Sequence, residues 1–423
     1  MLIIYRCLIN LLFPLVITIT YLRIWFNKED KNRFKEKLFI SSFNIKKNHN
    51  KKLIWFHAAS IGELKSLIPL IKKLNKERKF DFLITTVTLS SAKLISKIFL
   101  DEENITHRFF PFDQLKLVKK FLDNWSPDFV LFVDSEIWPN FLLEINKRNI
   151  PLILLNARIT KKSFLKWSLI PKTATKIFQS FNLCLASSNE SKRYLENLKA
   201  RNIKYFGNIK LSAENKMNDL NIQNKEILNN KKFWCAISTH KEEEIFCLKT
   251  HLNIKKIHKN IITVIIPRHI DRAKNIKLSC DKLNLKSQIL SSGELLTSDK
   301  EIIIINSYGV MSNYLKLCKS VFIGKSMIKK LEPIGGQNPI EAAKLGCKIY
   351  HGPYVYNFKE IYELFNKYKI SEKIFNENEL SNKLSSDLSK SNEIKDNKIE
   401  IINNLGKKIL NDTYNELNKI TGE

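Results

Sequence analysis

Several side chains suited to acid–base or phosphate chemistry come directly after short apolar runs in this sequence. Glu63 lies in HAASIGE and Glu136 in DSEIWPN, while Lys210 follows FGNI and Arg268 follows IIP. An ionised carboxylate can accept a proton, and a lysine or arginine at a strand end can bind a phosphate or a carboxylate. The pattern therefore points to a proton acceptor and to anion-binding groups.

Two interpretations of Glu63 are open. It stands at the expected start of a helix, where the helix dipole favours the ionised carboxylate and hence a base at neutral pH. Ser60 and Glu63 also match the S-x-x-E capping box, in which the glutamate satisfies backbone N–H groups. Taken alone, the motif favours the cap.

The next two motifs also have structural alternatives. Asp134 or Ser135 could cap the helix that follows DSEIWPN, with Trp138 packed underneath. Lys210 could be a solvated lysine in a lysine-rich chain. Glu136 and Lys210 are therefore candidates whose roles these residues alone leave open.

A further motif, GGQNPIEAAKLG, occupies residues 335–346. Its two glycines permit close backbone approach, Asn338 can cap a helix, and Pro339 suits the first helical position. Helix N-termini of this kind bind phosphates or ribose hydroxyls. The motif predicts a nucleotide-binding turn.

Short apolar runs alternate with helical patterns along the whole chain. Expected strands cover residues 53–58, 82–88, 107–113, 128–135, 151–158, 183–188 and 204–208, and then 233–239, 260–268, 302–306, 320–324 and 348–352. Expected helices cover residues 66–77, 90–99, 114–123, 141–148 and 242–256. This alternation predicts an α/β fold with two parallel, doubly wound, Rossmann-like sheets facing a ligand cleft.

The expected domains follow from these patterns. They are an N-terminal membrane anchor at 1–27, a first Rossmann-like domain at 28–210, a polar linker at 211–232, and a second Rossmann-like domain at 233–423.

The N-terminal segment is apolar, and residues 7–22 carry no charge. Sixteen to twenty helical residues reach roughly 24–30 Å, which is borderline for spanning a bilayer. The lysines and arginines that follow would keep the bulk of the chain in the cytoplasm. A signal peptide and a buried domain helix are the alternatives, and the sequence does not separate a span from a helix lying in one leaflet.

The charge and the cysteine content of the chain limit the kinds of function and partner that we expect. The 423 residues carry 71 Lys and Arg against 42 Asp and Glu, a formal charge of +29 that attracts anionic partners. No ribonucleoprotein or helix-turn-helix motif is visible, so nucleic acid is not expected as a partner. Seven scattered cysteines without C-x-x-C fit a reducing cytoplasm. No acidic or histidine cluster has convincing metal spacing, so neither a metal nor a cofactor is expected.

Six motifs in this order resemble the 3-deoxy-D-manno-octulosonic acid (Kdo) transferases of lipopolysaccharide synthesis, from about Leu53 to the Phe358 region. The resemblance implies a two-domain GT-B glycosyltransferase anchored on the cytoplasmic side of a bacterial inner membrane. It implies Glu63 as catalytic base, with Glu136 and Lys210 as transition-state stabilisers. It also implies a CMP-binding set: Pro267, Arg268, Gly309, Val310, Met311, Asn338, Pro339, Ile340 and Glu341.

Three positions depart from the family pattern. The chain has FIGKS, with Lys325, where members usually carry Gly-Gly before Ser; Val310 stands where a glutamate often follows the glycine; and GGQN replaces the commoner GGHN. The implied reaction is inverting transfer of Kdo from CMP-Kdo to the lipid A precursor lipid IVA. The alternatives are another GT-B enzyme that uses a UDP-sugar, and a non-catalytic basic protein that binds a membrane surface or nucleic acid. The number of Kdo residues transferred and the oligomeric state stay open.

Overall fold

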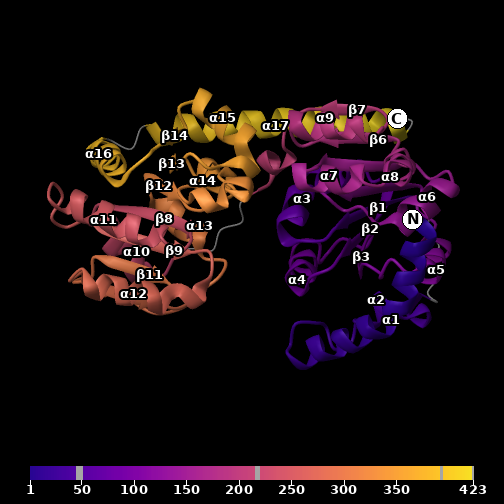
Figure 1. Cartoon of the computed structure of the whole chain (residues 1–423), viewed down its shortest axis with the longest axis horizontal. Helices are drawn as coiled ribbons and strands as arrows, with labels where there is room; N and C mark the ends of the chain where they lie inside the picture. The colour runs from indigo at the N-terminus through magenta and orange to yellow at the C-terminus, as the bar shows by residue number, and fades with distance from the viewer. Residues whose placement is uncertain (44–50, 215–219, 391–393, 422–423) are drawn as a thin grey trace. The chain divides into compact units, whose positions relative to one another are not determined.

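The chain folds into two compact units in a computed structural model that describes residues 1–43, 51–214, 220–390 and 394–421 (Figure 1). The first unit comprises Met1–Glu214 together with Leu405–Glu423, and the second comprises Asn215–Asn404. Each unit is built around one parallel sheet of seven strands.

The first sheet has the strand order β3-β2-β1-β4-β5-β6-β7, and every neighbouring pair is parallel. Its strands are β1 (Lys52–Ala58), β2 (Phe80–Thr86), β3 (Ile105–Phe109), β4 (Phe129–Val133), β5 (Leu152–Ala157), β6 (Leu183–Ala186) and β7 (Ile203–Tyr205). Every residue of β4 and β5 is buried, as expected for strands covered by helices on both faces.

The helices of this unit connect consecutive strands. They are α3 (Ile61–Asn75), α4 (Leu89–Ile98), α5 (Leu115–Trp125), α6 (Pro139–Lys147), α7 (Lys161–Ser168), α8 (Pro171–Phe178) and α9 (Asn189–Asn197), followed after β7 by the 3₁₀ turn η2 (Ile209–Ser212). The expected alternation of strands and helices is confirmed.

The second sheet has the order β10-β11-β9-β8-β12-β13-β14, again entirely parallel. Its strands are β8 (Phe233–Thr239), β9 (Ile262–Pro267), β10 (Ser287–Leu290), β11 (Ile302–Ile305), β12 (Ser320–Ile323), β13 (Lys348–His351) and β14 (Ser371–Lys373). The sequence did not predict β10 or β14, because these short edge strands are only partly buried and carry no apolar run.

The helices of the second unit are α10 (Ile222–Asn229), α11 (Glu243–Lys255), α12 (Ala273–Lys282), α13 (Met311–Leu317), α14 (Ile340–Lys344), α15 (Lys359–Lys367) and α16 (Glu377–Leu388), with 3₁₀ turns η3 (Ile270–Arg272), η4 (Lys329–Ile334) and η5 (Tyr356–Phe358). The stretch expected as a linker, 211–232, contains α10, and its residues 215–219 lie outside the described residues.

The N-terminal apolar helix is confirmed as α1 (Leu2–Trp25), which is long and apolar enough to cross a membrane by length and composition. The short α2 (Lys35–Leu38) and η1 (Ile40–Phe43) follow it. Both lie in the first unit.

The last helix, α17 (Ile394–Thr421), belongs to both units. Its residues from Leu405 onward join the first unit, whereas the sequence pattern assigned them to the second domain. Lys204 forms an ion pair with Glu416, and the Lys73 ammonium lies 4.2 Å from the centre of the Tyr414 ring. These contacts between distant parts of the chain have no local sequence signal.

At Gly406, α17 packs tightly against the backbone of Leu211. A Cβ atom at this position would meet the Leu211 carbonyl oxygen at 2.3 Å. Alanine would favour a helix by about 1 kcal/mol, but overpacking against backbone costs about 1–3 kcal/mol. Gly406→Ala should therefore lower the melting temperature, measured by thermal unfolding. The exposed neighbour provides the control, Lys407→Ala, which should melt like the unaltered protein. A higher melting temperature for Gly406→Ala would contradict this contact.

Candidate active site

The carboxyl edge of the first sheet gathers the polar residues that end its strands. Glu63 lies at the start of α3 after β1, Asp134 and Glu136 follow β4, Asn156 lies near the end of β5, and Lys210 lies in η2 after β7. Because all seven strands are parallel, their carboxyl ends share one edge. The fold thus brings together the three sequence-predicted residues Glu63, Glu136 and Lys210.

An ion pair organises this edge. The Lys210 ammonium donates to Oδ2 of Asp134, and the Asn156 amide donates to Oδ1 of the same carboxylate. Oδ1 of Asn156 in turn accepts from the backbone N–H of Ile209, at 3.1 Å, and so fixes η2. Lys210 is therefore held by a carboxylate and is not a freely solvated lysine. The sequence interpretation did not include Asp134 or Asn156 in the site. Their signal was a polar residue at the end of a buried strand.

Glu136 is held by two donors. Its Oε2 lies 3.1 Å from Nε2 of His57 and accepts from the Trp138 indole N–H at 2.7 Å. Burial alone would raise the pKa of the Glu136 carboxyl, but the His57 and Trp138 contacts outweigh it and lower that pKa. The sequence interpretation missed His57, although it belongs to the HAASIGE motif.

The structure corrects the expected cap of α6. Trp138 is its N-cap residue and makes no side-chain cap, so neither Asp134 nor Ser135 has that role. The Asp113 carboxylate instead accepts from the backbone N–H groups of Asn140 and Phe141, both at 3.0 Å. This cap comes from the loop after β3, which sequence spacing could not reveal.

Glu63 forms the capping box that its motif favours. Its Oε2 accepts from the N–H groups of Ala59 and Ser60, at 2.8 and 3.3 Å, while Ser60 Oγ accepts from the Glu63 N–H. Its second oxygen, Oε1, makes no hydrogen bond to any residue within the described ranges. One oxygen therefore caps the helix, and the other is available for chemistry.

The pKa of Glu63 lies above its ordinary value. Burial is the largest cause, and the negative charges of Asp134 and Glu136 add to it. The helix dipole alone predicted a lowered pKa, and burial, together with the negative charges of Asp134 and Glu136 after β4, overturns that expectation. A raised pKa brings a carboxylate closer to the working range of a general base at neutral pH.

The predicted CMP-binding residues lie at the carboxyl edge of the second sheet. Pro267 ends β9, and the next residue, Arg268, exposes its side chain. Gly309–Met311 follows β11 at the start of α13, and Asn338–Glu341 lies at the start of α14. Two buried polar atoms, Thr239 Oγ1 at the end of β8 and Asn313 Oδ1 in α13, make no hydrogen bond within the described part of the chain. This edge therefore offers a cation and unsatisfied polar groups.

In the GGQN turn, the glycines and Pro339 have other roles than the sequence predicted. Cβ atoms at Gly335 and Gly336 would meet the backbone of Tyr354 and Val355 at 2.4 and 2.9 Å, so the glycines make room for the protein's own chain. Asn338 Oδ1 accepts from the Ile340 N–H at 3.0 Å, as a capping residue does. The helix begins at Ile340, and Pro339 is its N-cap residue instead of its first helical residue.

Two buried carboxylates at the start of α11, Glu243 and Glu244, hold the neighbouring loops. Glu243 accepts from the N–H groups of His240, Lys325, Ser326 and Met327, at 2.7–3.0 Å. Glu244 accepts two hydrogen bonds from Arg272, both at 2.7 Å. These contacts fix the loops after β12 and β9.

Lys325 adds a second cation beside Arg268. Its backbone has a φ of 58°, in the left-handed region, and its N–H is held by Glu243. Burial, and next the charge of Arg268, lower the pKa of the Lys325 ammonium. Two cations within electrostatic reach of each other form an environment suited to an anion.

The 3-deoxy-D-manno-octulosonic acid transferase of Rickettsia bellii is 32% identical to this chain over 353 residues, which cover 82% of each protein. This chain belongs to the Kdo transferase family. The relative from Haemophilus influenzae is 27% identical over 320 residues, covering 74% of this chain and 73% of its own. A family model described as 3-deoxy-D-manno-octulosonic-acid transferase (kdotransferase) matches residues 32–213.

Solved structures support the fold of this Kdo transferase-family chain. A glycosyltransferase from Rickettsia africae aligns with a TM-score of 0.57 at 14% identity, covering 88% of this chain and 99% of its own. Anabaena HepE in complex with UDP gives a TM-score of 0.57 at 13% identity, covering 87% and 100%. Together with the two parallel sheets, these likenesses confirm the predicted GT-B type of α/β fold.

Glu243→Gln should destabilise the second unit, because an amide NH₂ would replace an oxygen that now accepts backbone N–H groups. The loss expected for a buried unsatisfied donor is about 1–3 kcal/mol, measured by denaturant unfolding. The adjacent, exposed Glu242 supplies the control, and Glu242→Gln should leave stability unchanged. Equal stabilities for the two variants would contradict the positioning role of Glu243.

Proposed function

We propose that this protein transfers Kdo from CMP-Kdo to the lipid A precursor lipid IVA, with inversion at the anomeric carbon. One observation carries the proposal: a half-buried carboxylate of raised pKa, Glu63, keeps one oxygen unpartnered beside the Asp134–Lys210 ion pair. Family membership gives the class of reaction, and the polar edges of the two sheets supply its chemical groups.

The proposed step is a single in-line displacement. Glu63 takes the proton of a sugar hydroxyl on the acceptor, and the hydroxyl oxygen bonds to the anomeric carbon of Kdo. The bond from that carbon to the cytidylate oxygen breaks on the opposite side, and CMP leaves with the electron pair. The products are the glycosidic bond, CMP and a protonated Glu63. Glu136 and Lys210 would stabilise the charges that develop.

The second unit would bind the donor. CMP-Kdo carries two anionic groups, the phosphate of the nucleotide and the carboxylate of the sugar. Arg268 and Lys325 offer two cations for these groups. Removing one preorganised contact to the developing charge typically costs about 2.7–4 kcal/mol of transition-state stabilisation.

The lipid acceptor places the proposed reaction at a membrane. The α1 helix is apolar, and the net charge of +29 attracts anionic headgroups and a phosphorylated acceptor. The proposed location is the cytoplasmic side of the bacterial inner membrane, where anionic lipid headgroups attract the lysines and arginines that follow α1.

Glu63→Gln should abolish most turnover and leave the fold intact, because glutamine can still cap α3 but cannot accept the proton. General-base catalysis typically contributes about 10²–10⁴-fold to the rate. Turnover is measured by mass spectrometry of the product formed from CMP-Kdo and lipid IVA, with UDP-sugars as alternative donors.

A second helix cap provides the matched control for Glu63. Glu379 accepts from the Phe375 N–H at 2.9 Å, and Asn376 caps the Glu379 N–H at 2.8 Å, in the second unit just after the edge strand β14. Glu379→Gln should retain full turnover. If Glu63→Gln also retained full turnover, Glu63 would only cap its helix. Activity with UDP-sugars but not with CMP-Kdo would contradict the proposed donor.

The acidic limb of the kcat/KM–pH profile should report the ionisation of Glu63. Its raised pKa places this limb at higher pH than for an exposed glutamate. Asp134→Asn removes a neighbouring negative charge, which favours ionised Glu63, so the limb should move to lower pH. Asp128→Asn is the control at the amino edge of the same sheet, where Asp128 accepts from the Leu53 N–H. An unmoved limb in Asp134→Asn would assign it to another group.

A further inference from the structure

One face of α1 is partly covered by the first unit along the length of the helix. Partly or fully buried residues recur every three or four positions: Leu2, Tyr5, Arg6, Ile9, Phe13, Val16, Ile17, Thr20 and Ile24. The large apolar side chains between them are exposed, among them Ile4, Leu8, Leu11, Leu15, Ile19 and Leu22. The helix therefore has one face on the protein and an apolar face that the first unit leaves uncovered.

The N-terminal half of α1 docks on the loop after β3 and on α6. Tyr5 donates its hydroxyl to Asp113 at 2.7 Å, and Arg6 Nε donates to Asn140 Oδ1 at 2.9 Å. One turn later, Gln114 donates to Asn10 at 3.1 Å, and the Phe13 ring lies 5.8 Å from that of Phe112. Side-chain hydrogen bonds and ring packing thus join this half to the first unit.

The C-terminal half of α1 packs on the segment that follows it. The Tyr21 ring meets Phe34 at 5.3 Å, and Arg23 pairs with Glu29, which also pairs with Lys37. Phe34 is buried. Both ends of the helix are therefore tied within the same unit.

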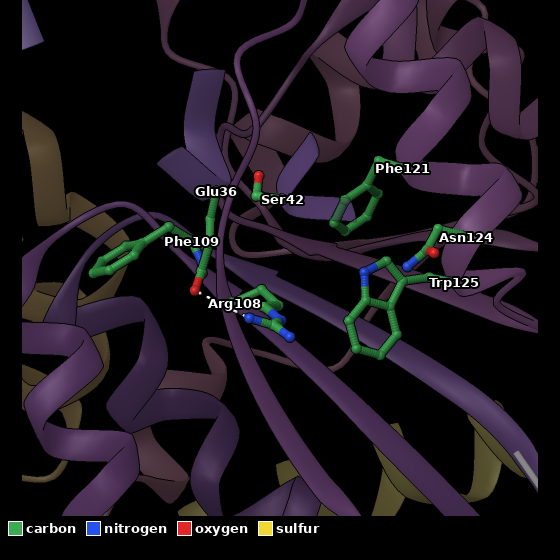
Figure 2. A pocket seen from close by; sticks show the side chains of 7 residues that line it. All are labelled: Glu36, Ser42, Arg108, Phe109, Phe121, Asn124 and Trp125. Atoms are coloured by element: carbon green, nitrogen blue, oxygen red, sulfur yellow. Dashed lines mark hydrogen bonds and ion pairs between the residues drawn. The ribbon is translucent and has the colours of Figure 1, made fainter. Parts of the chain in front are cut away.

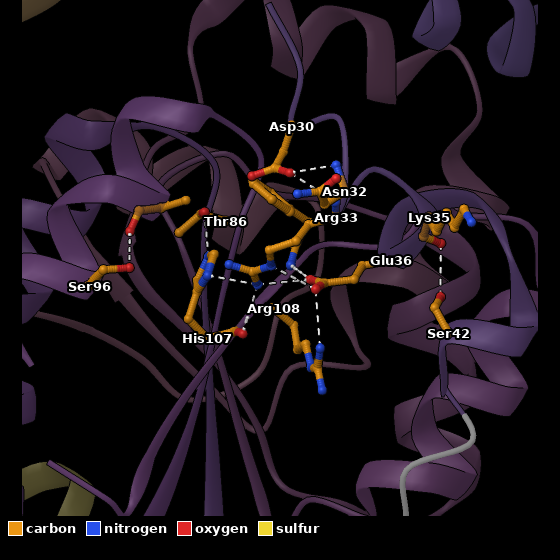
Figure 3. A network of polar contacts seen from close by, with 12 residues as sticks. Asp30, Asn32, Arg33, Lys35, Glu36, Ser42, Thr86, Ser96, His107 and Arg108 are labelled. Carbon is orange, nitrogen blue, oxygen red and sulfur yellow. Dashed lines mark hydrogen bonds and ion pairs between the residues drawn. The ribbon is translucent and has the colours of Figure 1, made fainter. Parts of the chain in front are cut away.

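The segment after α1 is itself anchored to β3. Figure 3 shows Glu36 between Arg33 and Arg108, and Arg33 also donates to the His107 carbonyl at 3.0 Å. Figure 2 shows residues that line a small pocket beside β3 and α5, among them Glu36 of α2, Ser42 of η1, Arg108 of β3, and Phe121 and Trp125 of α5. The segment that holds the C-terminal half of α1 is thus itself bonded to the first sheet.

These tethers conflict with a bilayer span. Tyr5 and Arg23 are 18 residues apart, which corresponds to about 27 Å of helix, close to the thickness of the hydrocarbon core. If α1 crossed the core, Asp113, Asn140 and Gln114 would have to enter it with their contacts, and buried polar groups are costly there. Detachment would expose the apolar covered stripe and leave the buried Asp113 without the Tyr5 hydroxyl.

We infer that α1 does not cross the bilayer but lies within a single leaflet, docked on the first unit, with its uncovered apolar face in lipid. The partner is an anionic leaflet, because Lys28, Lys31 and Lys35 follow the helix and Trp25 and Phe26 are exposed at its end. The inference does not rest on the proposed reaction, since its test reads topology and not turnover.

The topology test compares two labels in proteoliposomes of phosphatidylethanolamine and phosphatidylglycerol. Cys7 is the one exposed cysteine of the seven, so a Cys7→Ser background leaves only buried thiols. An environment-sensitive nitrobenzoxadiazole label is then attached through Ile4→Cys or Lys28→Cys, both at exposed positions. Dithionite added outside reduces only labels in the outer leaflet, and the Lys28 label reports the fraction of units that face outward.

A docked α1 predicts the same reduced fraction at position 4 as at position 28, in a reconstitution where most units face outward. A spanning helix predicts the complementary fraction, with the position 4 label protected until detergent is added. That second result would overturn the inference. Circular dichroism of both labelled proteins checks that they remain folded.

A crosslink tests the docking independently in native membranes. In the same background, the pair Asn10→Cys with Gln114→Cys should form an intramolecular disulfide on mild oxidation, because these side chains are in contact. The control pair is Leu11→Cys with Gln114→Cys, since Leu11 is 75% exposed on the uncovered face, and it should stay reduced. Equal crosslinking of both pairs, or of neither, would contradict a docked helix.

Discussion

The ion pair between Asp134 and Lys210 is the interaction on which the candidate site depends. Without it, the carboxyl edge of the first sheet would hold three neighbouring carboxylates, Glu63, Asp134 and Glu136, that repel one another. Breaking a partly buried pair leaves an uncompensated charge, which is strongly destabilising. Because Lys210 follows the last strand and Asp134 the fourth, the site exists only once the whole sheet has formed.

The two units use their buried carboxylates differently. In the first, Asp134 and Glu136 take side-chain donors and leave one oxygen of Glu63 unpartnered, so the edge keeps a group that can move a proton. In the second unit, the Glu243 carboxylate accepts hydrogen bonds from four backbone N–H groups, and these bonds fix the loop that carries Lys325, near Arg268. In the proposed reaction, proton transfer would therefore belong to the first sheet and anion binding to the second.

The sequence predicts what is local and misses what is paired at long range. Buried strands such as β4 and β5 are largely apolar runs, and the capping box joins Ser60 and Glu63, three positions apart, so both can be predicted from the sequence. The partner of Lys210 is 76 residues away, and the cap of α6 comes from Asp113, so neither has a sequence pattern. The predicted direction of the Glu63 pKa shift is wrong for the same reason. The local helix dipole is outweighed by burial and by the charges of Asp134 and Glu136, which follow β4.

The loop after β3 connects the lipid-facing helix to the candidate site. Asp113 accepts the Tyr5 hydroxyl of α1 and caps α6, the helix that begins just after Glu136. Three residues earlier, the Phe110 ring stacks on His57 at 3.7 Å and packs on Trp138 at 5.6 Å, the two donors that hold Glu136. With α1 in one leaflet, this rigid loop sets the carboxyl edge of the first sheet at the membrane surface. In the proposed reaction, the sugar hydroxyl of the lipid acceptor would lie at that surface, just outside its acyl chains, so a docked α1 would position Glu63 as well as anchor the protein.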